Sequence, residues 1–223
     1  MSHIEKAETA TVYANGTTAQ PQYYRKLGNP GPLGLYGFAS TTFILSMYNV
    51  SARGIATPNV VVGMALFVGG LAQFLAGMWE FACANSFGAT AFTMYGGFWM
   101  SFATVFIPGS GVTAAYATEE ELLSALGIYL ITWFIVTFLL LIASLRRNIG
   151  LIALFFFLTV TFGLLAGGYF SADHMPELIK AGGSMGIVTA LIAFYVGTAE
   201  LLSDPVNSWF ALPLGPIPKG RID

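Results

Sequence analysis

The sequence has few charged residues, one cysteine and two histidines. Only 9% of its 223 residues are charged, against about 25% in an ordinary soluble domain. The single cysteine, Cys83, excludes an internal disulfide and a metal cluster built from cysteines. The net charge of -2, with no basic block, argues against nucleic acid as a partner.

What the chain has instead is apolar sequence. Hydrophobic residues make up 56% of it and the mean hydropathy is +0.71. Crossing a hydrocarbon core of ~30 Å takes about 20 apolar residues, and six segments qualify. They are residues 33–50, 59–81, 88–107, 122–145, 149–170 and 182–203. We therefore predict an all-α integral membrane protein whose six transmembrane helices form a pore-containing bundle.

Lysine and arginine predict the orientation of this bundle. With six spans, one side holds seven basic residues: Lys6, Arg25, Lys26, Arg146, Arg147, Lys219 and Arg221. The other side holds only Arg53 and Lys180. Because basic loops stay in the cytoplasm, both termini are expected inside.

The predicted domain organisation is simple. Residues 1–28 are polar, and we expect a disordered cytoplasmic tail without a cleaved signal peptide. Residues 29–205 are expected to form one six-helix transmembrane domain, and residues 206–223 a cytoplasmic C-terminal tail. Breaks between spans include a tight charged turn at Arg146 to Asn148 and a loop that holds His174, Pro176 and Lys180.

Two helix starts favour anions. Asn29 is a good N-cap for the first helix, and Asn85 or Ser86 for the third. Both helices begin at the predicted cytoplasmic face, and helix N-termini attract negative charge. The alternative for Asn29 is a capped, tightly packed helix start without a ligand.

Polar side chains inside spans normally face the bundle interior, a partner or a water-filled path. Hydroxyls and amides such as Thr41, Thr42 and Gln73 can bond a small polar solute without trapping it, although a single hydroxyl can also bond its own helix. Glu80 and Glu200 are the only ionisable acids in the spans. They are candidates for proton coupling, since a partly buried carboxyl group can exchange a proton near physiological pH. Alternatively, each is a solvated helix-end acid or a structural acceptor.

An enzyme is the competing class of function. Ser110 and His174 could be cast as a serine protease pair, but no oxyanion motif accompanies them. His3 and His174 fall on opposite predicted sides of the membrane, which argues against a metal site. We predict no enzyme activity and no cofactor.

Several motifs together resemble one family. Residues 29–35 (NPGPLGL) look like the motif NPAPLGL of the acetate uptake transporter family, also called the succinate–acetate permease or GPR1/FUN34/YaaH family. Residues 69–73 and 76–80 resemble its second helix, residues 85–92 its GNTFGATAF element with residues 95–99 following, and residues 156–160 its fifth helix. The resemblance covers roughly residues 27–205, and the polar N-terminal tail is similar to that of fungal members.

The resemblance implies a protomer with its own pore, assembled as a cyclic hexamer in the plasma membrane. It implies transport of acetate and similar short monocarboxylates with protons. By motif position, Phe38, Tyr95 and Leu158 would form a pore constriction. The polar positions near the path would be Asn29, Gln73, Glu80, Asn85 and Thr90. Ammonium export and acetate sensing are the alternatives within the family.

This chain departs from the family pattern at two places. Gly31 replaces the alanine of the motif, which we expect to loosen the helix start. Ser86 stands where the family has threonine and keeps the hydroxyl. We therefore expect altered kinetics or selectivity rather than a lost fold.

Overall fold

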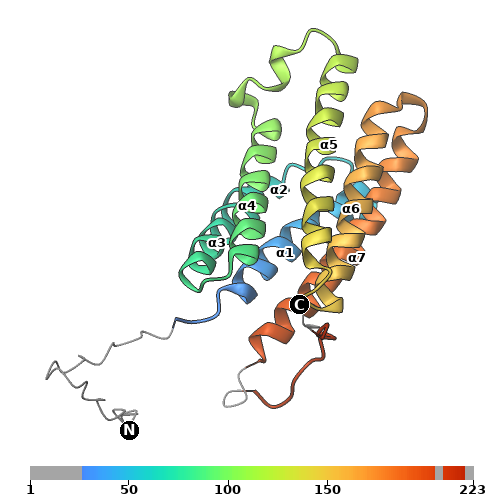
Figure 1. Ribbon diagram of the computed structural model, residues 1–223. Coiled ribbons are helices and arrows are strands. Elements are labelled where there is room, and N and C mark those ends of the chain that lie inside the picture. The colour runs from blue at the N-terminus through green and yellow to red at the C-terminus, as the bar shows by residue number, and fades with distance from the viewer. Residues whose placement is uncertain (1–26, 204–207, 219–223) are drawn as a thin grey trace, which may run out of the picture.

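The computed structural model describes residues 27–203 and 208–218, and this part of the chain is helical (Figure 1). Over these residues no strand forms, and the only β-type pairing is an isolated bridge between Asn148 and Pro216. The α-helices are α1 (Gly31–Asn49), α2 (Val61–Leu66), α3 (Gln73–Ala82), α4 (Ser86–Phe106), α5 (Glu119–Ser144), α6 (Ile149–Phe170) and α7 (Met175–Leu201).

Short helical turns connect these elements. The π-helix η2 (Phe67–Ala72) joins α2 and α3 into one continuous helix, Val61–Ala82. The 3₁₀ turns are η1 (Ala52–Gly54), η3 (Pro108–Ser110), η4 (Thr113–Ala115) and η5 (Ala172–His174).

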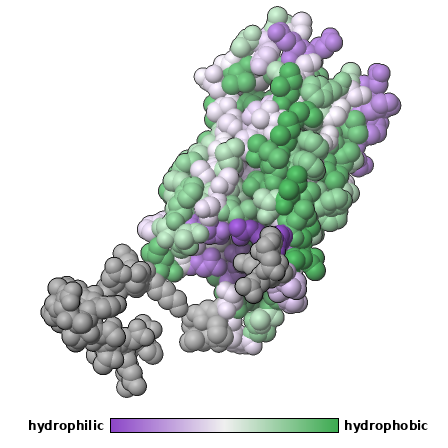
Figure 2. Space-filling model, viewed as in Figure 1, coloured by the Kyte–Doolittle hydropathy of each residue, from purple (hydrophilic) through white to green (hydrophobic). Residues whose placement is uncertain are grey.

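Among the described residues, four helices are long and apolar enough to cross a membrane: Val61–Ala82, Glu119–Ser144, Ile149–Phe170 and Ala172–Leu201. The helices α1 and α4 are not among them, because glycine, serine and threonine lower their hydropathy. Hydrophobic side chains cover the long helices, and hydrophilic ones gather toward the two ends (Figure 2). The chain is therefore an all-helical, multi-pass membrane protein.

The connections alternate between the two ends of the bundle. In Figure 1, α1 begins and α7 ends at the lower end, where the α3–α4 and α5–α6 turns also lie. The α4–α5 and α6–α7 connections lie at the upper end. The start of α1 and the end of α7 therefore lie at the same end of the bundle as the basic α5–α6 turn. That this end is cytoplasmic stays a prediction.

Helix starts follow the capping chemistry in three places. Asn85 caps α4 by accepting from the Gly88 amide at 3.3 Å, and Asn148 caps α6 by accepting from the Leu151 amide at 2.8 Å. Thr118 caps α5, and three glutamates fill its first turn. Each cap satisfies an amide donor that has no partner within the helix.

Two predictions about helix starts are wrong. The N-cap residue of α1 is Pro30 rather than Asn29, although the Asn29 side chain still accepts from the Gly31 amide at 2.9 Å. The last helix begins at Met175, seven residues before the predicted 182, so it includes the predicted loop residues Pro176 and Lys180. Proline is tolerated there because the amides of a first helical turn have no intrahelical partner.

The bundle is held by close helix contacts around an aromatic core. Helix α1 packs along α7, where Gly183 leaves room for the Asn49 side chain: a Cβ at position 183 would lie 2.7 Å from that side chain. Small residues of this kind let membrane helices approach closely. In the core, the Phe98 ring contacts Trp99, Phe102 and Phe162 within 5.6 Å between ring centroids.

Candidate functional site

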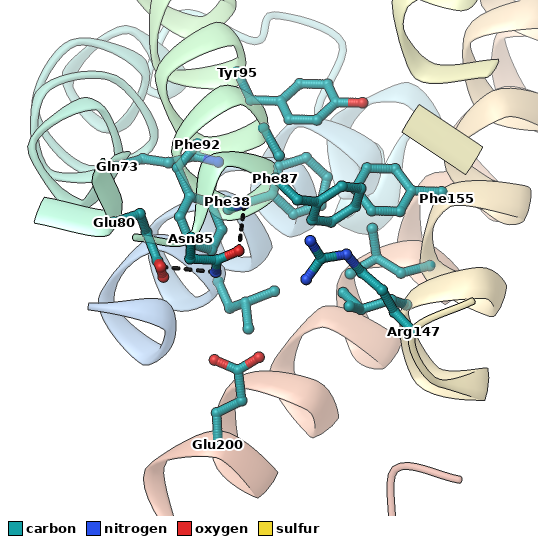
Figure 3. A pocket seen from close by; sticks show the side chains of 15 residues that line it. Phe38, Gln73, Glu80, Asn85, Phe87, Phe92, Tyr95, Arg147, Phe155 and Glu200 are labelled. Atoms are coloured by element: carbon teal, nitrogen blue, oxygen red, sulfur yellow. Dashed lines mark hydrogen bonds between the residues drawn. The ribbon is translucent and has the colours of Figure 1, made fainter. Parts of the chain in front are cut away.

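A cavity of about 70 Å³ opens among five of the long helices (Figure 3). Its lining comes from α1, the α2–α3 helix, α4, the α5–α6 turn with α6, and α7. The lining residues are Leu35, Phe38, Gln73, Glu80, Asn85, Phe87, Gly88, Ala91, Phe92, Tyr95, Arg147, Leu151, Leu154, Phe155 and Glu200.

This cavity is polar at one end and mostly aromatic at the other. We call Glu80, Asn85, Arg147 and Glu200 the mouth, since they lie at the end of the bundle where the α3–α4 and α5–α6 turns are found. Asn85 and Tyr95 are ten residues apart on α4, which corresponds to about 15 Å along a helix. A solute would therefore pass from charged and amide groups to aromatic rings over that distance.

On one side of the mouth, Glu80 and Asn85 are joined. The Asn85 side-chain amide donates to a Glu80 carboxylate oxygen at 2.8 Å, while its oxygen caps α4. Glu80 is only 4% exposed. Gly88 makes this arrangement possible, because a Cβ there would lie 2.9 Å from the Glu80 carboxyl carbon.

Glu200 approaches from α7 on another side (Figure 3). Its carboxylate interacts with the Asn29 side chain and lies at the first residue of α1. A Cβ on Gly31 would overlap a Glu200 carboxylate oxygen, so an alanine there would force Glu200 into another rotamer. Gly31 thus has a packing role that the sequence did not reveal.

Arg147 forms the third side of the mouth, and no motif in the sequence marks it as a site residue. Its guanidinium points into the cavity and lies 4.0 Å from the centre of the Phe87 ring. Partial burial lowers the pKa of Arg147 from its usual value, whereas the nearby Glu80 and Glu200 carboxylates oppose this change. The usual pKa of arginine lies so far above physiological pH that Arg147 stays a cation.

Gln73 is the most unusual residue of the inner end. Its side chain is completely buried, and neither its amide nitrogen nor its oxygen has a hydrogen-bond partner within the described part of the chain. A buried polar group without a partner costs about 1–3 kcal/mol. Because Gln73 lines the cavity, a solute that both donates and accepts hydrogen bonds would relieve this cost.

The three predicted constriction residues meet in the core next to this end. The Phe38 and Tyr95 rings lie 5.4 Å apart, and the Tyr95 hydroxyl is 2.8 Å from that of Thr137 on α5. Leu158 lies one turn beyond the cavity-lining Leu154 on α6 and belongs to the same buried cluster. Their role as a constriction stays a prediction.

A second cavity, of about 90 Å³, lies farther along the same helices. Leu45 lines it on α1, seven residues beyond Phe38. Phe98 lines it on α4, three residues beyond Tyr95, and Phe162 lines it on α6, four residues beyond Leu158. The predicted constriction residues therefore lie between the two cavities or at their boundary.

Four of the predicted path residues do not line the first cavity. Asn29 lies beside the mouth on Glu200. Thr41 donates to the Gly37 carbonyl at 3.0 Å, and Thr90 is exposed and donates to the Ser86 carbonyl at 2.8 Å. Thr42 is buried, and its hydroxyl has no hydrogen-bond partner among the described residues.

Ser110, the serine of the competing enzyme hypothesis, is bonded to backbone. Its hydroxyl donates to the Thr104 carbonyl at 2.6 Å. Across residues 27–203 and 208–218, no three histidine, cysteine or acidic side chains come together as metal ligands.

Comparison with known proteins is consistent with this geometry. The sequence profile of the GPR1/FUN34/yaaH family matches residues 12–219. The chain belongs to this family. It is 42% identical over 232 residues to acetate permease A of Emericella nidulans, covering 98% of this chain and 77% of that protein. It is 46% identical over 199 residues to ammonia transport outward protein 2 of Saccharomyces cerevisiae, covering 86% of this chain and 70% of that protein.

The bacterial relative SatP extends the comparison to three dimensions. The Escherichia coli protein, named a succinate-acetate/proton symporter, is 36% identical over 191 residues, or 85% of this chain and 96% of its own length. A solved structure described as the bacterial acetate channel SatP matches with a TM-score of 0.75 and 36% identity, over 85% of this chain and all of that one.

Proposed function

We propose that this protein moves acetate and related short monocarboxylates, together with protons, through a path inside each protomer. One observation carries the proposal: a cavity with a charged mouth ends at Gln73, a buried carboxamide whose donor and acceptor are both unpartnered. A carboxylic acid has the complementary acceptor and donor. Relatives named acetate permease and succinate-acetate/proton symporter support this choice of substrate.

The proposed transport event begins at the mouth. There the carboxylate meets Asn85 at the start of α4. It is partly dehydrated among aromatic rings and bonds to Gln73. It then passes between Phe38, Tyr95 and Leu158 into the second cavity. Polar groups without fixed positive charge along the deep path hold the solute weakly enough for release.

Glu80 and Glu200 are the proposed proton carriers. They line the same cavity from α3 and α7, so a proton on either one is close to the path of the solute. A carboxylate that enters with a proton crosses the apolar centre as a neutral acid, which avoids the cost of burying a charge.

The architecture that we propose has six spanning helices, with the α2–α3 helix counted as one and α1 and α4 as the two more polar spans. Both termini are cytoplasmic, residues 29–205 are the transporter domain, and the protein is a homohexamer of the plasma membrane. We infer transport without enzyme activity, because the relatives in the comparison are named for transport and the Ser110 hydroxyl is bonded to backbone.

Uptake of labelled acetate into proteoliposomes tests the proposal. We expect protein-dependent accumulation when an inward proton gradient is applied, and loss of accumulation when the gradient is collapsed. Protein-free vesicles are the control for acetic acid that crosses the lipid on its own.

Other outcomes would change the assignment. Uptake that only equilibrates would replace proton coupling with a channel-like pore. Uptake no faster than in protein-free vesicles would contradict acetate transport, and ammonium flux would then be measured in the same vesicles.

A further inference from the structure

The chain that follows α7 returns to the mouth. The Ile149 amide donates to the Gly215 carbonyl at 2.9 Å and the Gly150 amide to the Leu214 carbonyl at 3.2 Å. In the opposite direction, the Ile217 amide donates to the Arg147 carbonyl at 3.1 Å. Residues 213–217, which we call the strap, are thus paired with the α5–α6 turn.

The pairing has a clear physical basis. The first amides of a helix have no partner inside it, and α6 begins at Ile149. The strap carbonyls satisfy its first two amides, and the Asn148 side chain satisfies that of Leu151. Gly215 has a positive φ of 63°, which lets the strap bend into this position.

A second contact ties the strap to α7. The Tyr195 hydroxyl donates to the Pro213 carbonyl at 2.7 Å. The Leu214 side chain also packs against the buried core. The strap therefore links α7 to the turn that carries Arg147.

The strap thus bonds the Arg147 backbone, and the Phe87 ring lies against the Arg147 guanidinium. Among the residues that the structure describes, no hydrogen-bond acceptor is paired with this guanidinium. Its N–H groups face the cavity between the Glu80 and Glu200 carboxylates (Figure 3). A planar guanidinium binds a carboxylate through two parallel hydrogen bonds.

We propose that Arg147 selects carboxylate anions at the mouth and that the strap positions it for this task. The inference rests on the proposed function and adds to it a specificity-determining residue and the element that holds it. Glu80 and Glu200 repel an incoming anion, and Arg147 offsets that repulsion locally. Arg147 thereby directs a monocarboxylate to one place in the mouth.

Substitutions at Arg147 test whether this residue selects carboxylate anions. Arg147→Gln should raise the half-saturating acetate concentration roughly tenfold, the size expected for one lost charge-assisted contact. The maximal rate should change little. Arg147→Lys keeps the charge and should recover much of the affinity.

Salt dependence separates selection from a structural role. Because salt screens exposed charges, the half-saturating concentration of the wild type and of Arg147→Lys should rise with ionic strength. That of Arg147→Gln should not. A merely destabilised protein would lose maximal rate and keep its salt dependence.

Substitutions that loosen the strap test whether the strap positions Arg147. Gly215→Val places a β-branched residue at positive φ, and Tyr195→Phe removes the bond to Pro213. Both should raise the half-saturating concentration in the same direction as Arg147→Gln, but less. Tyr36→Phe is the matched control, since its hydroxyl bonds Thr198 on α7 and does not touch the strap.

The outcomes are distinguishable. A wild type that does not carry acetate overturns the proposed function. A wild type that carries acetate, with an Arg147→Gln variant of equal affinity and salt dependence, overturns the role of Arg147 alone. If both strap variants match Tyr36→Phe, the strap has no positioning role.

Discussion

The buried carboxamide of Gln73 is expected to lower the stability of the protein and to raise its rate of acetate transport. This carboxamide has no partner, so replacing Gln73 with an apolar residue of similar size removes a cost of about 1–3 kcal/mol. We expect Gln73→Leu to raise the melting temperature in detergent and to lower the rate of acetate transport by about tenfold, the effect of losing roughly 1.4 kcal/mol.

The two measurements need to be made on the same preparation. A variant that is more stable and slower indicates that the carboxamide is kept for the solute. A Gln73→Leu variant that is more stable and transports acetate at the wild-type rate would contradict the role of Gln73.

Phe38 and Leu158 give a second residue-scale prediction. Phe38→Ala and Leu158→Ala widen the passage between the two cavities, so transport of acids larger than propionate should increase relative to acetate. The measurement is competition between labelled acetate and unlabelled acids of increasing size. Unchanged selectivity in both variants would remove the constriction hypothesis.

Two further variants guard against an uninformative result. Truncation of a buried leucine or phenylalanine to alanine costs about 2–5 kcal/mol, and Leu158→Val is the milder change if Leu158→Ala does not fold. Phe156→Ala on the same helix is the control, because Phe156 is half exposed on the outside of the described bundle.

At the scale of single residues, resemblance to family motifs singled out candidate site residues that hydrophobic periodicity alone could not. Gln73, Glu80, Asn85, Phe38 and Tyr95 all line the cavity. Their roles in the path and the constriction, which motif resemblance implies, stay predictions. Arg147 was missed, because in sequence it is only a charged turn residue. Its inward direction depends on Phe87 and the strap, which are distant in sequence.

N-caps stabilise individual helices, and we expect one of them to affect acetate affinity as well. Asn148→Ala should destabilise the protein by about 1 kcal/mol, the usual value for a lost N-cap, and so should Thr118→Ala. Only Asn148 lies beside Arg147 and the strap. We therefore expect only Asn148→Ala to raise the half-saturating acetate concentration as well.

Thermal unfolding and transport kinetics of the two cap variants check this expectation. Equal loss of acetate affinity in both would mean that general destabilisation, rather than the geometry of the mouth, controls binding.

Helix boundaries were predictable where the sequence carries an end signal. The fifth predicted span, 149–170, coincides with α6 because Asn148 begins it and Ser171 follows it. The last helix was predicted too short, since Pro176 was interpreted as a loop residue although a first turn accepts proline. The bonds of the strap could not be predicted, because they are backbone contacts without a side-chain pattern.

The whole molecule has one natural probe of its orientation. Cys83 is the only cysteine, and it is exposed next to the α3–α4 turn at the end of the bundle that holds the mouth. If that end is cytoplasmic, a membrane-impermeant maleimide should label Cys83 only after the cells are permeabilised.

A cysteine placed at the opposite end of the bundle is the control for this labelling. In a Cys83→Ser background, Ser110→Cys at the opposite end should react in intact cells. Labelling of Cys83 in intact cells would invert the proposed topology. The number of spans and their direction are set by the bilayer, so the packing of one chain does not determine them.

The wide turn Phe67–Ala72 has a consequence for how the second long helix can vary. Along this helix the buried positions Val61, Ala65, Gly69 and Gln73 repeat every four residues. In a regular α-helix with about 3.6 residues per turn, such a stripe would drift by about 40° at each step. The π-helical turn removes that drift.

The direction in which the Gln73 and Glu80 side chains point around the helix axis therefore depends on the number of residues in the turn before them. Deleting one residue from Phe67–Ala72 would leave Gln73 seven positions after Ala65, a spacing that a regular α-helix also keeps on one face. Inserting one residue would instead rotate both side chains by about 100° away from the cavity, although every residue that lines the cavity would remain. A one-residue insertion in this segment is thus expected to be more damaging than a one-residue deletion or than most substitutions in it.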